Sequence, residues 1–421
     1  MTSADTPLGL TVRSPDATKP GPSGVVEDEV GHAGAGTVDG SARRVTARLA
    51  SRLAWLRGFV RIETDVRAIA ALDGIRGLAA SLVFIVHYQA AFGRLLEDRP
   101  AAHAAGRYAA LVGYHGVTLF FVLSGFLIYG SLISRPVPLR KFLRRRVRRI
   151  YPTFLAVLAL YLTVGQLLAV RDKLPPGGTI PYLLANVALL PGVFHIKPII
   201  TVSWSLSYEI FYYLGIAALV TWLAMRRWSA RQRVGFFLAL VVLWGLSGAS
   251  GQRAVGSFIM FVPGILLWEL SQVPAAEKIR ARVHPAIVWG GLVAALLVVP
   301  SLTMRPVEQG LRSFGTTPAV VAFALLAASM PLLLLHALGA DGPVARTLGR
   351  ESLRFVGVIS YSFYLIHGVA INLLALLFWR VVGASPPHGV LLYFALLPAV
   401  YGAAVLMALL LFRTVEQRLS L

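Results

Sequence analysis

The sequence predicts an all-α, polytopic integral membrane protein with about ten transmembrane helices and with both termini in the cytoplasm. The first observation behind this prediction is the composition. Of the 421 residues, 57% are hydrophobic and only 14% are charged, whereas soluble domains carry about a quarter charged residues. The second observation is that the apolar residues come in blocks of about 20, the length that crosses a bilayer as a helix. A typical soluble enzyme is therefore excluded.

The third observation is the distribution of the basic residues. The chain carries 40 Lys and Arg against 19 Asp and Glu, a net charge of +21. If the N-terminus lies inside, 29 basic residues fall on inner segments and ten on outer segments. Positive residues collect on the cytoplasmic side of membrane proteins, so the asymmetry orients the chain in the cell (plasma or inner) membrane. It also explains much of the basic excess without nucleic acid as a partner.

The chain divides into four predicted parts. Residues 1–40 are rich in Gly, Pro, Ser, Thr and Asp, and we expect a disordered cytoplasmic tail because they have little apolar surface to bury. Residues 41–68 are basic, with apolar residues at helical spacing. They fit an amphipathic helix on the inner leaflet and, equally well, a positive juxtamembrane stretch that orients the first span. Residues 69–412 form the predicted transmembrane domain, and residues 413–421 form a short cytoplasmic C-terminus.

The ten predicted spans are mostly apolar segments long enough to cross the hydrocarbon core. The longest predicted outer segment, 171–200, contains a Pro-Pro-Gly-Gly run and then a short apolar stretch, residues 181–190. We expect this stretch to form a re-entrant or interfacial helix on the outer side. The spans cover residues 69–91, 108–133, 150–170, 201–225, 234–250, 254–272, 285–303, 318–338, 355–379 and 390–412.

Two ionisable residues lie inside the first predicted span. Ionisable side chains in a bilayer are costly and usually face the interior of a helix bundle. Arg76 and His87 are eleven residues apart, which is close to three full turns, or about 16 Å along one helix face. We therefore expect Arg76 in the inner half of the membrane and His87 in the outer half, both facing one cavity. A packed histidine and a snorkelling arginine are the structural alternatives, but the pairing favours a catalytic site.

A carboxylate and a second histidine lie in later spans. Glu209 is near the outer end of the predicted span 201–225, at a depth similar to that of His87. A carboxylate there can orient an imidazole, raise its basicity or contact a substrate hydroxyl. The structural alternative for Glu209 is a hydrogen bond to Tyr or Ser of a neighbouring span. For His367, within the predicted span 355–379, a structural role is favoured.

The predicted inner segment 135–149 carries eight cations, more than topology requires. Lipid head groups are one expected ligand. A phosphorylated cytoplasmic ligand is the other, because arginine offers paired N–H donors that fit phosphate oxygens. Arg146 and Arg149 are three residues apart and would share a helix face, and Arg145 adjoins them.

Several chemistries are excluded by absence. No cysteine is present, which excludes disulfides, thiolate zinc sites, iron–sulfur clusters and a cysteine nucleophile. The chain also lacks a nucleophile elbow, a Walker loop, a His-Glu-x-x-His motif and a dinucleotide fingerprint. The other seven histidines lie in the tail, in outer segments or alone near span ends. They do not have the spacing of metal ligands, so no metal is expected.

Five segments, in order, resemble the acyltransferase-3 family of integral membrane, acyl-CoA-dependent O-acyltransferases. The resemblance covers about residues 70–412, and Leu421 ends the chain without the C-terminal esterase-like domain that many members carry. The chain thus resembles the stand-alone branch, whose acceptors include surface glycans and macrolide-type small molecules. The segments are residues 72–80 with His87, 120–128, 145–152, 203–209 and 361–367. The first matches the family's Arg-x10-His signature at Arg76 and His87. The third matches its Arg-x-x-Arg pattern at Arg146 and Arg149.

The resemblance implies transfer of an acyl group, acetyl being the first expectation, from cytoplasmic acyl-CoA to a hydroxyl of a glycan or of a glycosylated or macrolide-type small molecule. The donor phosphates would bind Arg145, Arg146 and Arg149. Membrane lipids and the acceptor are the expected partners.

The resemblance also implies roles for the three residues inside the spans. His87 would act either as a general base on the acceptor or as a nucleophile that is acylated and passes the group on. Arg76 would hold the donor or stabilise the developing oxyanion. Glu209 would assist His87 or the acceptor from the outer side.

The main alternative is a membrane transporter or exporter of a carbohydrate or metabolite, without covalent chemistry. Transporters usually show broken helices in two symmetric halves, whereas the polar residues here concentrate in the first four spans. A membrane scaffold is a second alternative, but it leaves the pair Arg76 and His87 unexplained.

Overall fold

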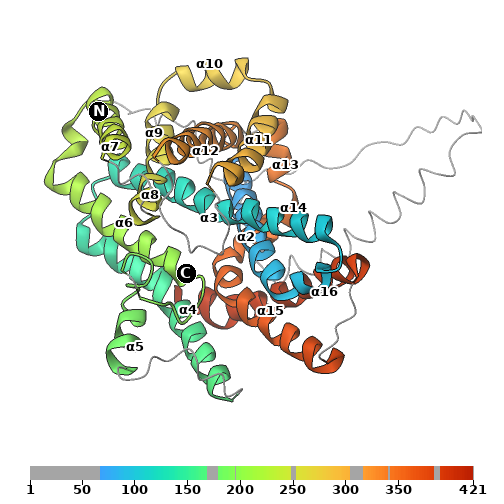
Figure 1. Ribbon diagram of the computed structural model, residues 1–421. Helices are drawn as coiled ribbons and strands as arrows, with labels where there is room; N and C mark the ends of the chain where they lie inside the picture. The colour runs from blue at the N-terminus through green and yellow to red at the C-terminus, as the bar shows by residue number, and fades with distance from the viewer. Residues whose placement is uncertain are drawn as a thin grey trace, which may run out of the picture. The chain divides into compact units, whose positions relative to one another are not determined.

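The computed structural model describes residues 67–167, 179–194, 196–247, 253–303, 316–339, 342–383 and 389–420. Within these ranges the secondary structure is helical, without a β-strand (Figure 1). All of them belong to one compact unit, Thr64–Leu421. The predicted tail, residues 1–40, and nearly all of the basic segment 41–68 lie outside the described residues.

The described helices follow the order of the predicted spans, and each predicted span overlaps at least one helix. The helices are α2 (Arg67–Phe92), α3 (Pro100–Ser134), α4 (Leu139–Leu167), α5 (Thr179–Val187), α6 (Ser203–Trp222), α7 (Ala230–Leu246), α8 (Arg253–Ile259), α9 (Val262–Ser271), α10 (Ala275–Arg282), α11 (Pro285–Thr303), α12 (Thr316–Ala337), α13 (Pro343–Leu348), α14 (Glu351–Val358), α15 (Ser360–Val382) and α16 (Val390–Leu411), followed by a π-helix, Phe412–Ser420.

Six helices in the described ranges are long and apolar enough to cross a membrane, and up to seven if a bent pair is counted as one span. The six are α2, α3, α4, α12, α15 and α16, the last together with the π-helix. The bent pair joins the segment Gly256–Ser271 to α10 at an angle of 105°. The protein is therefore an all-helical, polytopic membrane protein in this part of the chain, and the count of ten spans stays a prediction.

Three element boundaries differ from the prediction. The basic segment 135–149 is mostly helical, because α4 begins at Leu139 and continues without interruption into the apolar part. The predicted span 355–379 is broken at Ile359, where α14 ends and α15 begins. At the C-terminus, the π-helix brings Glu416 into the interior, where the residue is only 2% exposed.

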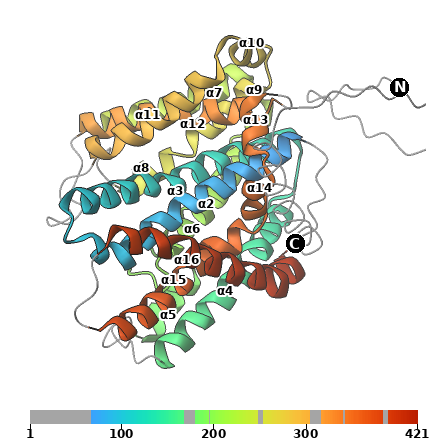
Figure 2. The same ribbon diagram turned by 90° about the vertical axis from the view of Figure 1, so that its right-hand side faces the viewer.

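Helix α2 lies at the centre of the helical packing. Figure 2 shows α2 and α3 running alongside each other, with α11 and α12 on one side and α15 and α16 on the other. Residues Ala71, Ile75 and Ala79 of α2 are fully buried and belong to an apolar cluster shared with α3, α9, α11, α12 and α13. This packing fixes the orientation of α2, which carries both members of the Arg-x10-His pair.

Glycines allow the backbones of neighbouring helices to meet at the closest crossings. A Cβ added at Gly74 would lie 1.8 Å from the carbonyl oxygen of Leu348, the last residue of α13. At the crossing of α3 and α9, a Cβ at Gly125 would lie 2.1 Å from the carbonyl oxygen of Phe261, and one at Gly264 would lie 1.9 Å from that of Val122. Since small residues let membrane helices approach closely, these positions fix how the helices cross.

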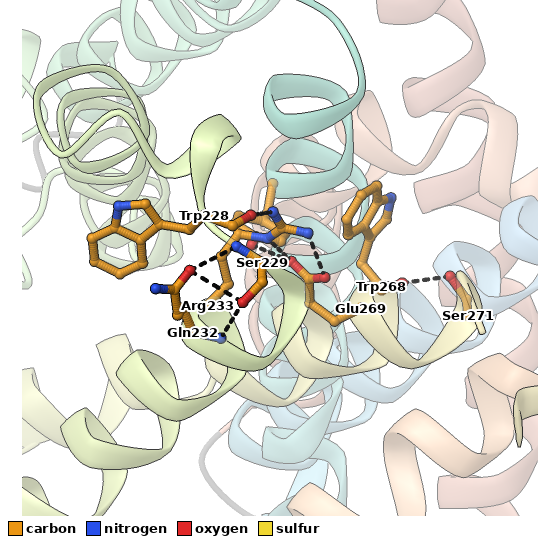
Figure 3. A network of polar contacts seen from close by, with 8 residues as sticks. Trp228, Ser229, Gln232, Arg233, Trp268, Glu269 and Ser271 are labelled. Atoms are coloured by element: carbon orange, nitrogen blue, oxygen red, sulfur yellow. Dashed lines mark hydrogen bonds and ion pairs between the residues drawn. The ribbon is translucent and has the colours of Figure 1, made fainter.

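A buried ion pair joins α7 to α9, as Figure 3 shows. The guanidinium of Arg233 donates from Nε to Oε1 of Glu269 at 2.5 Å and from Nη2 to Oε2 at 2.9 Å. The Tyr129 hydroxyl of α3 donates to the same carboxylate at 2.5 Å. Ser229 and Gln232 form a capping box at the start of α7. Both oxygens of the carboxylate are bonded within this network, which joins α3, α7 and α9, so we assign the network to structure.

Replacing Gly125 by Ala should destabilise the protein by about 1–3 kcal/mol, because the new methyl group meets backbone that cannot move independently. Gly290→Ala on α11 is the matched control, since a Cβ there has nothing within 4 Å; it should be neutral or stabilising by about 0.5–1 kcal/mol. Thermal unfolding of both variants in detergent, followed by tryptophan fluorescence, measures the difference. Equal midpoints would contradict the close crossing of α3 and α9.

Candidate functional site

A polar cavity of about 290 Å³ lies among α2, α3, α4, α6 and α15. Its walls combine guanidinium, carboxylate and hydroxyl groups with apolar side chains from α3. The polar lining residues are Arg76, Ser124, Arg146, Arg149, Ser205, Glu209, Tyr213, Ser360, Tyr361 and Tyr364. Four of the residues selected from the sequence, distant along the chain, therefore meet in one place: Arg76, Arg146, Arg149 and Glu209.

Helical spacing decides which cations of α4 reach the cavity. Phe142 and Ile150 are buried, and Arg146 and Arg149, at the intervening inward positions, are half-buried and line the cavity. Arg145 is exposed and is not among the lining residues. The exposed basic residues of α4 are Arg140, Lys141, Arg144, Arg145 and Arg148.

The guanidinium of Arg146 packs against aromatic rings. It lies 5.4 Å from the ring centroid of Phe142 and 5.5 Å from that of Tyr213, distances at which a cation is attracted to a ring face. Its Nε atom is buried and has no hydrogen-bond partner among the described residues. Arg146 is thus held in place by rings while part of its hydrogen-bonding capacity stays unused.

Arg76 is paired with a carboxylate one helical turn away. Its Nη1 atom donates to Oδ1 of Asp73 at 3.0 Å, and the two side chains are 31% and 11% exposed. Asp73 was not selected from the sequence as a site residue, although its spacing of three from Arg76 is a signal for such a pair. The pair offsets part of the positive charge that the three arginines bring to the cavity.

Glu209 belongs to the arginine cavity. Its Oε1 atom accepts hydrogen bonds from the Ser124 hydroxyl at 3.4 Å and from the Tyr213 hydroxyl one turn along α6. The sequence left open whether Glu209 acts on His87 or bonds to neighbouring Tyr and Ser groups. In the structure the bond from Ser124 of α3 is of the second kind, and the bond from Tyr213 comes from the same helix as Glu209.

The hydroxyl residues around Glu209 hold α6 in position. Tyr208 donates to the Gly192 carbonyl at 2.5 Å, and the Ser207 hydroxyl donates to the Pro191 carbonyl. The Ser205 and Tyr364 hydroxyls lie 2.7 Å apart, which ties α6 to α15. The predicted apolar stretch 181–190 is mostly helical, as part of α5, and it leads into the segment that contains Pro191 and Gly192.

His87 lies next to the cavity, with a second histidine as its neighbour. The half-buried ring of His87 is 5.1 Å from the ring of His367, centroid to centroid. The ring of His367 is in turn 6.1 Å from the ring of Tyr364, which lines the cavity. His87 itself is not among the lining residues. The structure thus places Arg76 and His87 in adjacent but different surroundings.

A buried carboxylate near the site was missed by the sequence reasoning. Glu416 of the π-helix accepts hydrogen bonds through Oε2 from the Ser362 backbone N–H at 3.1 Å and from the Ser362 hydroxyl at 2.5 Å. These bonds fix the first turn of α15, the helix that carries Tyr361, Tyr364 and His367. The sequence pattern gave no signal, because Glu416 lies beyond the last apolar block and reads as part of a solvated terminus.

Comparison with known proteins identifies relatives of the chain. The family model described as an acyltransferase domain matches residues 69–413. The acyltransferase MdmB of Streptomyces mycarofaciens is 28% identical over 325 residues, which cover 72% of this chain and 79% of MdmB. The exopolysaccharide production protein ExoZ of Rhizobium meliloti (strain 1021) is 28% identical over 293 residues, 65% of this chain and 81% of ExoZ. No solved structure matches the chain.

Proposed function

The chain belongs to the acyltransferase-3 family and is an O-acyltransferase, and we propose that it moves an acyl group, most simply acetyl, from a cytoplasmic acyl-CoA to a hydroxyl group of a glycan or of a glycosylated small molecule. We propose the plasma or inner membrane as its location. The observation that carries the donor proposal is the convergence of Arg76, Arg146 and Arg149 on one cavity.

The charges of the cavity favour an anionic ligand. Arg76 is neutralised by Asp73. Among the described residues, neither Arg146 nor Arg149 forms an ion pair with a carboxylate. Asp73 and Glu209 together supply two negative charges against the three arginines, so one positive charge is left without a counter-charge. Such a charge in a membrane protein is costly unless an anion joins it. The phosphate groups of a coenzyme A donor supply that charge, with oxygens that suit arginine donors.

The size of the cavity indicates which part of the donor it holds. Pockets for drug-sized ligands occupy about 300–1,000 Å³, so a cavity of about 290 Å³ holds only a part of coenzyme A. Arg76 and His87 are about 16 Å apart along α2. The extended pantetheine arm, which separates the phosphates from the thioester, can bridge such a length. We propose that the phosphates bind at Arg146 and Arg149 and that the arm passes Arg76 toward His87.

The chemistry follows either of two routes at His87. On the first, a ring nitrogen takes the proton of the acceptor hydroxyl while the hydroxyl oxygen attacks the thioester carbonyl. The carbon–sulfur bond then breaks, and the thiolate takes the proton from the imidazolium. On the second, the ring nitrogen attacks the carbonyl, the carbon–sulfur bond breaks and the thiolate leaves. The acceptor oxygen then attacks the acylated imidazole, the carbon–nitrogen bond breaks, and the hydroxyl proton passes to the thiolate. Both routes yield an ester and a free coenzyme A thiol.

Two further roles follow from the contacts. Because Arg76 lies three turns from His87, it suits donor binding better than stabilisation of an oxyanion at His87. Glu209 bonds within the arginine cavity, so we propose that it shapes the donor site. A glycan acceptor is supported by the name of one relative, an exopolysaccharide production protein.

The proposed topology places both termini in the cytoplasm, which brings α4 to the donor side. It rests on the 29 basic residues on inner segments against ten on outer segments. A reporter fused at Gly178 should be external, and one fused after Leu421 should be cytoplasmic. Reporters on the same side of the membrane would contradict this topology.

Replacing both Arg146 and Arg149 by Gln should raise the apparent KM for acyl-CoA by about a hundredfold or more, because two charge-assisted hydrogen bonds are lost. The matched control replaces Lys141 and Arg144, exposed residues of the same helix, by Gln and should leave KM nearly unchanged. The measurement is donor titration with purified protein in detergent. An equal response of the two double variants would assign these arginines to lipid contact or topology.

Replacing His87 by Ala should lower turnover by at least about 10²–10⁴-fold, the usual contribution of a general base. His336→Ala removes another buried imidazole, on α12, and should keep most of the activity. Acyl transfer is measured with purified protein, and size-exclusion profiles verify that each variant is folded. A folded His87→Ala variant with near wild-type turnover would refute the catalytic proposal.

A further inference from the structure

The pair of His87 and His367 joins two helices beside the arginine cavity. Their ring centroids are 5.1 Å apart, and the ring planes are tilted by 58°. His87 comes from α2 and is half-buried, whereas His367 comes from α15 and is fully buried. At this centroid separation, two ring nitrogens that point toward each other come within hydrogen-bond distance.

The tautomer of His367 follows from its hydrogen bonding. Its Nδ1 atom lies 3.0 Å from the carbonyl oxygen of Phe363. A carbonyl can only accept a hydrogen bond, so Nδ1 must carry the proton. In the neutral ring Nε2 is then an acceptor with a lone pair. This Nε2 atom is buried and has no hydrogen-bond partner among the described residues. Buried acceptors in native structures nearly always have a partner.

His87 is the neighbour that can serve this acceptor. Four rings contact His367: those of Phe84, His87, Phe363 and Tyr364. The two phenylalanines have no polar hydrogen. The Tyr364 hydroxyl already bonds to the Ser205 hydroxyl and the Val202 carbonyl. Of the four, only the imidazole of His87 has an uncommitted N–H group.

We propose that His367 is a positioning residue that accepts a hydrogen bond from one ring nitrogen of His87 and thereby keeps the lone pair on the other nitrogen. This inference rests on the proposed role of His87. It follows the logic of catalytic triads, in which a third group fixes the tautomer and orientation of the base. His367 takes no proton in either route. When His87 becomes an imidazolium, its N–H bond to His367 becomes charge-assisted and stronger.

The surroundings of His367 are rigid enough for such a role. The ring of Phe363 stacks on it at 5.7 Å with an interplanar angle of 13°. The hydrogen bonds from Ser362 to Glu416 fix the start of α15, one turn before His367. A positioning group needs this kind of support, because its effect depends on orientation rather than on charge.

Two amide variants separate positioning from packing. In His367→Gln the amide reaches the place of Nε2, so its oxygen can accept the bond from His87. In His367→Asn the shorter amide reaches only the place of Nδ1. Both variants are polar and neutral. We expect His367→Asn to lower kcat by about tenfold or more with little change in the donor KM, and His367→Gln to keep most of kcat. His115→Asn replaces a buried histidine of α3 and controls for loss of an imidazole.

A double-mutant cycle shows whether His367 acts through His87. Adding His367→Asn to His87→Ala should not lower the residual turnover further, because the group that it positions is already gone. Equal turnover of His367→Gln and His367→Asn, or the same loss from His367→Asn with and without His87, would overturn the proposal. These outcomes concern His367 alone, whereas a fully active His87→Ala variant would overturn the proposed function itself.

Discussion

The close contact between α2 and the segment formed by α13 and α14 is the constraint on which the site depends. Gly74 and Gly77 allow this contact, since a Cβ at either would lie within 2.2 Å of a backbone oxygen of that segment. With about 100° per residue, Arg76 and His87 lie within about 20° of each other on the helix, on the side opposite Gly74 and roughly a quarter turn from Gly77. With this face of α2 packed against its neighbour, Arg76 lines the cavity and His87 contacts His367 of α15.

The second requirement is a set of charges that is incomplete without a ligand. Asp73 compensates Arg76, and the carboxylate of Glu209 is bonded to hydroxyl groups. Arg146 is held by aromatic rings rather than by an acid. A protein that spans a membrane tolerates such a cation where it serves a pathway or a binding site. The apolar α3 wall lowers the local dielectric constant and so strengthens the attraction for an anionic donor.

Much of this arrangement could be predicted from the sequence, because it depends on local periodicity. The helix order and the shared face of Arg146 and Arg149 follow from spacing within single segments, and the family follows from the resemblance of five segments in order. The neighbour of His87 does not, since His367 is 280 residues away and no local pattern joins α2 to α15. Glu416 was missed for a similar reason: its burial depends on the packing of the π-helix, not on its own segment.

The arginines and the imidazoles lie in different surroundings, and we propose that the arginines bind the donor while the imidazoles serve the acyl transfer. In the proposed mechanism, contacts to the donor phosphates are the same in the ground state and in the transition state, so they would strengthen binding without accelerating the reaction. In the same mechanism the imidazole of His87 changes its charge only as the acyl group moves, so the proposed hydrogen bond to His367 would strengthen at that moment. Tyr364 borders both regions, and its hydroxyl is held by Ser205 and Val202. The ring of Tyr364 thus links the wall of the arginine cavity to His367, the neighbour of His87.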